Sequence, residues 1–81
     1  MNNFQRMNAI VTAVFRDRGF AFAISEVNGQ SHFLHYHDFT AEDEFAELRP
    51  GDIVAFTGVQ LPGPHPPRGL VVRVVQKMAT T

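Results

Sequence analysis

The sequence of 81 residues predicts an all-β fold, a small five-stranded antiparallel barrel. Three observations predict it. Apolar residues alternate with polar ones along five short segments, and helical periodicity is almost absent. These segments are rich in β-branched and aromatic residues, and clusters of Gly, Pro and Asn separate them. The length suits one domain, expected over residues 8–77, with flexible tails at 1–7 and 78–81.

The first three strands are expected in the N-terminal half of the chain. Asn8–Phe15 is rich in β-branched and aromatic residues, and Gly19–Ser25 alternates Phe with Ala. The segment Val27–Gln30 contains the Asn-Gly pair that is typical of a tight hairpin turn. His32–Tyr36 therefore returns as the third strand.

The remaining strands follow a long connection. Asp38–Arg49 is acidic and mixed in character, which indicates a connection with room for one helical turn. After a Pro-Gly turn, Asp52–Gln60 reads as the fourth strand and Leu70–Val75 as the fifth. The proline-rich segment Leu61–Pro67 between them cannot donate ladder hydrogen bonds and is expected to be an extended loop. Five short strands with this connection are typical of an OB-fold, a Greek-key barrel.

Composition limits the classes of function. The chain has no cysteine, which excludes disulfides and thiolate metal sites. No long apolar run is present, so neither a secretory signal nor a membrane span is expected. A cytoplasmic location is therefore expected. The formal net charge of −1 argues against nucleic-acid binding, which usually needs a basic surface. Most acids, however, lie between Glu26 and Asp52, and several arginines lie outside that block.

The second and third expected strands carry a cluster of aromatic residues. Alternation places Phe20 and Phe22 on one side of a strand and two alanines on the other. Phe33 and His35 likewise share a side, with Leu34 opposite. If the hairpin pairs the two strands, the four rings form one cluster.

This cluster has two interpretations. Apolar rings usually belong to the core. An imidazole is unusual in a core, however, and Leu34 is available to fill the interior instead. Arg16 and Arg18 also flank the first pair of rings. Exposed rings beside arginines suit a single-stranded nucleic acid, whose bases stack with about 1–3 kcal/mol each while the cations contact phosphates.

Two motifs in this region resemble those of the cold-shock domain family. Arg18–Phe22 reads Arg-Gly-Phe-Ala-Phe where the family has a Lys-Gly-Phe-Gly-Phe-type motif, and His32–Tyr36 reads His-Phe-Leu-His-Tyr where the family has Val-Phe-Val-His-Phe. Phe45–Phe56 resembles the family's aromatic-x-x-Leu-x-x-Gly-x-x-Val-x-Phe stretch, and an Arg-Gly pair precedes the last strand. The similarity covers residues 10–75.

The resemblance implies a five-stranded barrel that binds single-stranded RNA or DNA on its outer aromatic surface, in many relatives as an RNA chaperone or a transcription or translation regulator. It implies no enzyme activity and no cofactor. Stacking is implied for Phe20, Phe22, Phe33 and His35, a phosphate contact for Arg18, an extension of the platform for Tyr36 and Phe45, and a bordering position for Arg68.

The first strand departs from the family. Its Thr-Ala-Val-Phe segment, residues 12–15, stands where the family usually has Lys-Trp-Phe-Asn. Phe15 could replace a missing ring if the strand contains a bulge or shifts by one residue. Phe15 and the neighbouring Arg16 are therefore included among the candidate binding residues.

Other clusters are weaker candidates. His32, His35, His37 and Asp38 form the one metal-like group, but they match no standard ligand motif, and no metal site is expected. The carboxylates of residues 42–47 lack a partner nucleophile and are expected to be solvated.

The last strand suggests an alternative function. If one side of the strand faces inward, Val71, Arg73 and Val75 lie outside and make an apolar surface. A homodimer, including one formed by strand exchange, could cover this surface. The alternative is therefore a barrel with a degraded nucleic-acid site that acts as a dimer or binds a protein partner.

Overall fold

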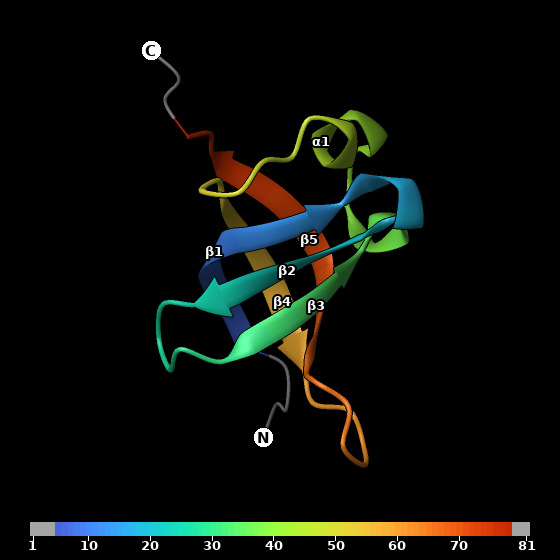
Figure 1. The fold of residues 1–81 in the computed structure, drawn as a ribbon. Helices are drawn as coiled ribbons and strands as arrows, with labels where there is room; N and C mark the ends of the chain where they lie inside the picture. The colour runs from blue at the N-terminus through green and yellow to red at the C-terminus, as the bar shows by residue number, and fades with distance from the viewer. Residues whose placement is uncertain (1–4, 79–81) are drawn as a thin grey trace.

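The computed structural model describes residues 5–78 and is a closed five-stranded barrel (Figure 1). The strand order around the barrel is β1-β2-β3-β5-β4. The strands are β1 (Gln5–Phe15), β2 (Phe20–Ser25), β3 (Ser31–His35), β4 (Ile53–Val59) and β5 (Arg68–Gln76). The predicted all-β barrel of the OB type is confirmed.

One strand pair differs from the predicted antiparallel arrangement. β3 and β5 run parallel and are joined at Phe33 and Arg68, whereas the other four neighbouring pairs are antiparallel. The reason is geometric. Strand directions can alternate all the way around a closed ring only when the number of strands is even, so a ring of five must contain a parallel pair.

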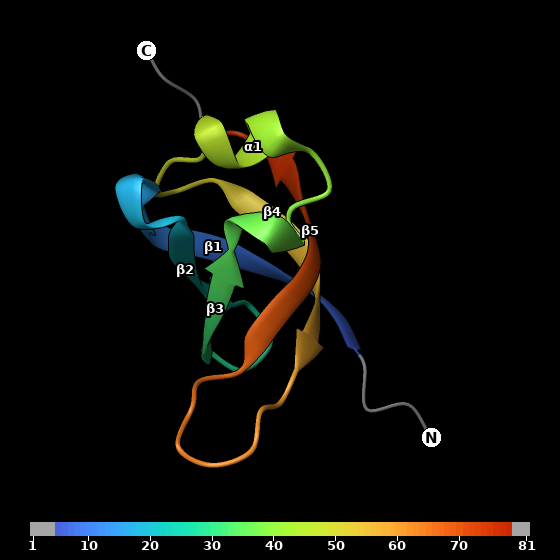
Figure 2. The ribbon, with the colours of Figure 1, turned by 90° about the vertical axis from the view of Figure 1, so that its right-hand side faces the viewer.

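Short helices fill two of the connections. The 3-10 turn η1 (Arg16–Arg18) joins β1 to β2, and η2 (Tyr36–Asp38) follows β3. The helix α1 (Glu42–Ala46) is the helical turn expected in the acidic connection. α1 lies over one end of the barrel, and the loop of residues 61–67 projects from the other end (Figure 2). Within residues 5–78, no helix has the length and apolar character needed to cross a bilayer.

The domain begins earlier than residue 8, the expected boundary. Gln5, Arg6 and Met7 already pair with β4, and the Met7 side chain packs against the core. These residues belong to the sheet because β4 offers a pairing partner along its whole length. Met78, the first residue of the expected C-terminal tail, is tied to the fold, because its backbone N–H donates to Asp52 Oδ1 at 2.8 Å. The other expected tail positions, 1–4 and 79–81, lie outside the described residues.

The barrel interior is filled by one side of each strand. Ala21 and Ala23 of β2 are fully buried, and the larger Leu34 and Phe56 occupy the space beside them. Packing is so close that a Cβ atom on Gly69 would lie 2.6 Å from Leu34 Cδ2. Because these residues fill the interior, the phenylalanines on the opposite side of β2 and β3 must lie outside the barrel.

Candidate nucleic-acid interface

A bulge in β1 turns Phe15 toward the outer surface. Val11 pairs with Ala23, but the next pair along the strands joins Ala13 to Phe22, so one extra residue lies in β1. The extra residue reverses the alternation of inward and outward side chains. Val11 is therefore buried inside the barrel, whereas Phe15 lies outside with 41% of its surface exposed.

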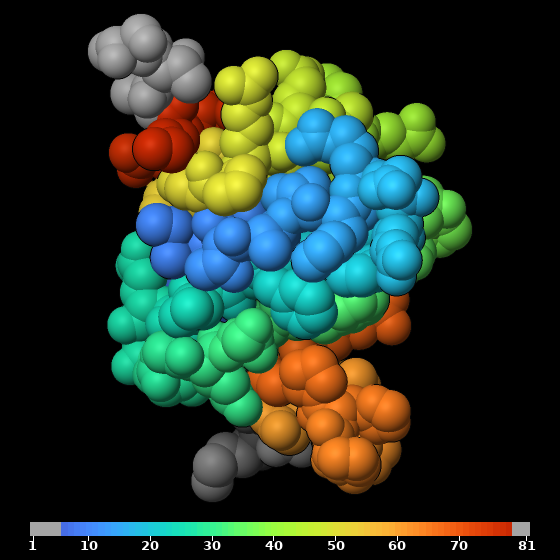
Figure 3. Space-filling view, viewed as in Figure 1, coloured from blue at the N-terminus to red at the C-terminus, as the bar shows by residue number. Residues whose placement is uncertain are grey.

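Five rings from three strands form a continuous group on this outer surface, which we call the aromatic face. The Phe20 ring lies 4.9 Å from that of Phe15 and 5.4 Å from that of Phe33, measured between ring centroids. Figure 3 shows the three strands forming the surface that is turned to the viewer. The members of the aromatic face are Phe15, Phe20, Phe22, Phe33 and His35.

Tyr36 continues the aromatic face past the end of β3. Its ring lies 4.7 Å from that of His35, and 46% of the residue is exposed. The ring packs directly over Gly19, where a Cβ atom would lie 2.7 Å from Tyr36 Cδ1. Gly19 also has a left-handed backbone with a φ of 80°. Glycine at this turn therefore permits both the backbone conformation and the close approach of the tyrosine.

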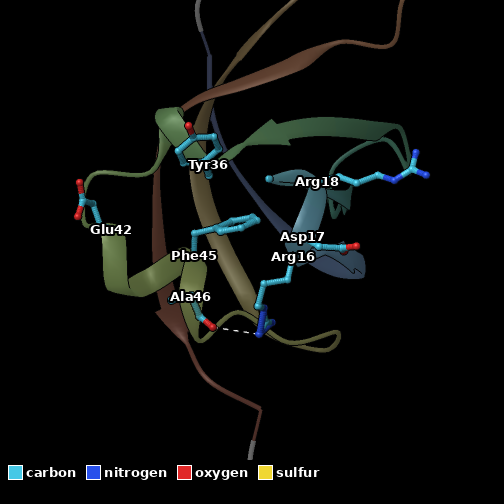
Figure 4. Close-up of a pocket in the computed structure, with 8 residues that line it drawn as sticks. Arg16, Asp17, Arg18, Tyr36, Glu42, Phe45 and Ala46 are labelled. Atoms are coloured by element: carbon cyan, nitrogen blue, oxygen red, sulfur yellow. Dashed lines mark hydrogen bonds between the residues drawn. The ribbon is translucent and has the colours of Figure 1, made fainter.

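A pocket of about 560 Å³ lies beyond Tyr36, between η1 and α1 (Figure 4). Tyr36 and Phe45 form its apolar side, and residues of η1 form the other. Two acidic residues, Asp17 and Glu42, also line this pocket, and Figure 4 shows the Glu42 carboxylate pointing away from Phe45. The volume lies within the range of small-molecule sites, about 300–1,000 Å³.

The structure places Phe45 in the core rather than on the predicted platform. Only 7% of the residue is exposed, and its ring lies 5.4 Å from that of Phe39. The cause is the position of α1 over one end of the barrel (Figure 1), which packs Phe45 of this helix, and Leu48 just beyond it, into the core cluster. Phe45 reaches a ligand only through the small surface that lines the pocket.

The three candidate arginines differ in their contacts. The Arg16 guanidinium donates to the carbonyl oxygens of Ala46, at 3.0 Å, and of Leu48. The Arg68 Nε donates to Asp38 Oδ2 at 2.8 Å. Within residues 5–78, the Arg18 guanidinium has no hydrogen bond or salt bridge, and it extends away from the pocket (Figure 4).

The histidines are not gathered into one site. His32 points into the barrel, where 2% of it is exposed, and its ring lies 5.0 Å from that of Phe56. His35 lies on the outside, and its Nδ1 accepts a hydrogen bond from the His37 backbone N–H. No group of three or more potential metal ligands occurs in the described part of the chain.

The aromatic face has an apolar extension that was not predicted from the sequence. Ile10 and Ile24 are paired across β1 and β2, and they are 41% and 38% exposed. Ile24 lies on the same side of β2 as Phe20 and Phe22, so the alternation that predicted those rings also contained the signal for Ile24.

No family model matches this chain, and no curated protein matches it. The cold-shock resemblance therefore stays a prediction that rests on the motifs quoted above.

Proposed function

We propose that this chain binds single-stranded RNA or DNA, with the bases stacked on the aromatic face. One observation carries the proposal. Four phenylalanines and a histidine gather outside a barrel whose interior is already filled by other residues of the same strands. Phe15 is exposed and the other four are half-buried, and a contiguous apolar surface that stays accessible outside the barrel usually marks an interaction site.

Single strands suit this surface better than duplexes do. A stacked duplex hides the flat faces of its bases, whereas a single strand can turn each base toward a protein ring. Tyr36 and the adjacent pocket offer a place for a base at the η1 end of the aromatic face. Arg18, which is exposed at that end, is available to a phosphate.

The proposed role follows the cold-shock resemblance. A protein that stacks on exposed bases favours open strands over weakly paired ones, and this activity suits an RNA chaperone or a regulator of transcription or translation. Such a role needs no catalysis and no cofactor, and it is a cytoplasmic one. The barrel, the aromatic positions on β2 and β3, and Arg18 support this proposal.

Fluorescence polarisation with labelled oligothymidine and oligouridine tests the proposal. We expect Phe20→Ala and Phe33→Ala each to raise the dissociation constant at least about fivefold, because each loses a stacking contact worth roughly 1–3 kcal/mol. Val75→Ala, at a position 54% exposed on β5, is the control and should bind as the wild type does.

Circular dichroism of each variant establishes that the barrel is folded. Unchanged affinity in folded Phe20→Ala and Phe33→Ala would contradict the proposal, as would the absence of binding by the wild type.

A second candidate function is supported by apolar surface outside the aromatic face. Val71 and Val75 of β5 are 57% and 54% exposed, as expected for the outer side of the last strand. A dimer or a protein complex would cover this surface. Sedimentation analysis separates the candidates, because a monomer that binds oligonucleotide tightly would exclude the second one.

A further inference from the structure

Three arginines lie near the aromatic face, yet they are not equivalent sources of positive charge. Arg16 and Arg18 belong to η1 at one end, and Arg68 begins β5 beside Phe33. A phosphate contact releases counterions only when the cation is not already neutralised or held elsewhere. The contacts of each guanidinium therefore decide how strongly the strand's backbone is bound.

Arg16 is held by the fold. Its Nη1 and Nη2 donate to the carbonyls of Ala46 and Leu48, which lie at and just beyond the C-terminal end of α1. Carbonyls at a helix end lack partners within the helix, so Arg16 satisfies groups that would otherwise need water. Contact with a phosphate through these nitrogens would require breaking both hydrogen bonds.

Arg68 is neutralised by Asp38. Their side chains are 37% and 14% exposed, and the Nε–Oδ2 distance is 2.8 Å. Arg68 pairs with Phe33 across β3 and β5, and Asp38 is held against Arg68 by the salt bridge. A phosphate that approaches Arg68 therefore also approaches the Asp38 carboxylate. The pair adds no net charge at this edge of the aromatic face.

Arg18 is the remaining one of these three cations. It is exposed, and no side chain or carbonyl within residues 5–78 accepts a hydrogen bond from it. The chain as a whole, with a formal net charge of −1, provides no general attraction for a polyanion.

We infer that, of the three arginines near the aromatic face, Arg18 alone contacts a phosphate of the bound strand, so that binding depends only weakly on salt and on the charge of the strand's backbone. This inference rests on the proposed function. The salt slope is the slope of the logarithm of the binding constant against the logarithm of the salt concentration. One neutralised phosphate gives a slope of about −0.7, whereas three would give about −2.1. Affinity should therefore fall about 2.6-fold between 50 and 200 mM salt rather than about 18-fold.

The direct test compares two heptathymidines, one with ordinary phosphodiesters and one with uncharged methylphosphonates. We expect their dissociation constants to differ less than about tenfold, and the phosphodiester to show a slope shallower than about −1.4. A heptamer of abasic sites, which keeps the charge and lacks bases, should not bind measurably.

Variants of the charged residues show which side chains are responsible for the salt slope. Arg18→Ala should flatten it toward zero, and Arg68→Ala should leave it unchanged. Asp38→Asn keeps an acceptor for Arg68 but removes the carboxylate charge, so the slope should steepen by about 0.7. Arg73→Ala, at an exposed position on β5 paired with Ala55, is the matched control and should have no effect.

Two outcomes would overturn the inference while leaving the proposed function intact. One is a phosphodiester slope steeper than about −1.4 or a methylphosphonate strand bound more than about tenfold more weakly. The other is a flatter slope in Arg68→Ala. Failure of the proposed function looks different, because affinity would then not respond to Phe20→Ala.

Discussion

Val71 has the least expected backbone conformation in the fold. Its φ is 54°, in the left-handed region, where a residue other than glycine costs about 1–2 kcal/mol. The register explains why the fold accepts this cost. Val71 and Val72 together lie opposite Phe56, which makes a bulge in β5. The bulge keeps Val72 buried, and the Val72 carbonyl accepts a hydrogen bond from the Thr40 N–H at 3.0 Å.

Replacing Val71 with glycine should therefore stabilise the protein. We expect Val71→Gly to raise the free energy of unfolding by about 0.5–1 kcal/mol, because the relief of strain exceeds the added backbone entropy of glycine. Urea denaturation measures the change. Val75→Gly, in the same strand but without a positive φ, is the control and should lower stability by about 1 kcal/mol. Equal destabilisation by both substitutions would show that the bulge holds no strain.

At the scale of elements, Asp52 connects the start of β4 to the end of β5. Its carboxylate is fully buried and accepts hydrogen bonds from the backbone N–H groups of Arg49 and Met78 and from Lys77 Nζ, at 3.0, 2.8 and 2.6 Å. Lys77 Nζ also donates to the Glu47 carbonyl at 2.6 Å. The C-terminal end of β5 is thus fixed to the connection that follows α1.

This contact makes stability depend on pH in acid. Burial opposes the ionisation of Asp52, but the Lys77, Met78 and Arg49 hydrogen bonds and the Lys77 charge outweigh it and lower the pKa below 3.8. Since the folded-state pKa is the lower one, Asp52 stabilises the fold fully above its unfolded pKa, and this stabilisation is lost as the pH falls through the folded pKa.

We expect Asp52→Asn to lower the free energy of unfolding by about 1–3 kcal/mol at neutral pH, because the variant loses the charge-assisted hydrogen bonds. The difference from the wild type should shrink as the pH falls below 3.8, the ordinary value, because the wild-type carboxyl is then protonated too. Urea titrations at neutral pH and at several acidic values measure this difference. A difference that stays constant over the whole range would exclude ionised Asp52 as its cause.

Much of the element structure follows from local sequence pattern. Alternation in β2 and β3 predicts both the strands and the side on which Phe20, Phe22, Phe33 and His35 lie. The bulge that turns Phe15 outward could be raised only as a possibility, since a bulge depends on how two strands pair rather than on the residues of one.

The contacts of the charged residues could not be predicted from the sequence. Arg16 binds carbonyls 30 and 32 positions away, and Arg68 and Asp38 are separated by 30 positions. Such pairs are created by closure of the barrel, and nothing in their local sequence distinguishes them from solvent-exposed charges. The prediction that Phe45 extends the platform was wrong for a similar reason. Its burial depends on the position of α1 over the barrel end, which is a tertiary property that the local sequence does not reveal.

At the scale of the whole molecule, the surfaces proposed for the two candidate functions lie on different strands of the barrel. The aromatic face covers β1, β2 and β3, α1 lies over one end, and the proline-rich loop projects from the other (Figure 1). The exposed valines of β5 lie on another part of the barrel wall, because β5 is hydrogen-bonded to β3 and β4. The surfaces of the two candidate functions can therefore be distinguished by locating the ligand.

The most direct measurement is a set of ¹H–¹⁵N NMR spectra of the labelled protein during titration with heptathymidine. We expect the largest chemical-shift changes at the amides of β2, β3 and η1, in particular those of Phe20, Phe22, Phe33 and Arg18. Shift changes concentrated at Val71–Val75 of β5, or no shift changes at all, would contradict the assignment of nucleic-acid binding to the aromatic face.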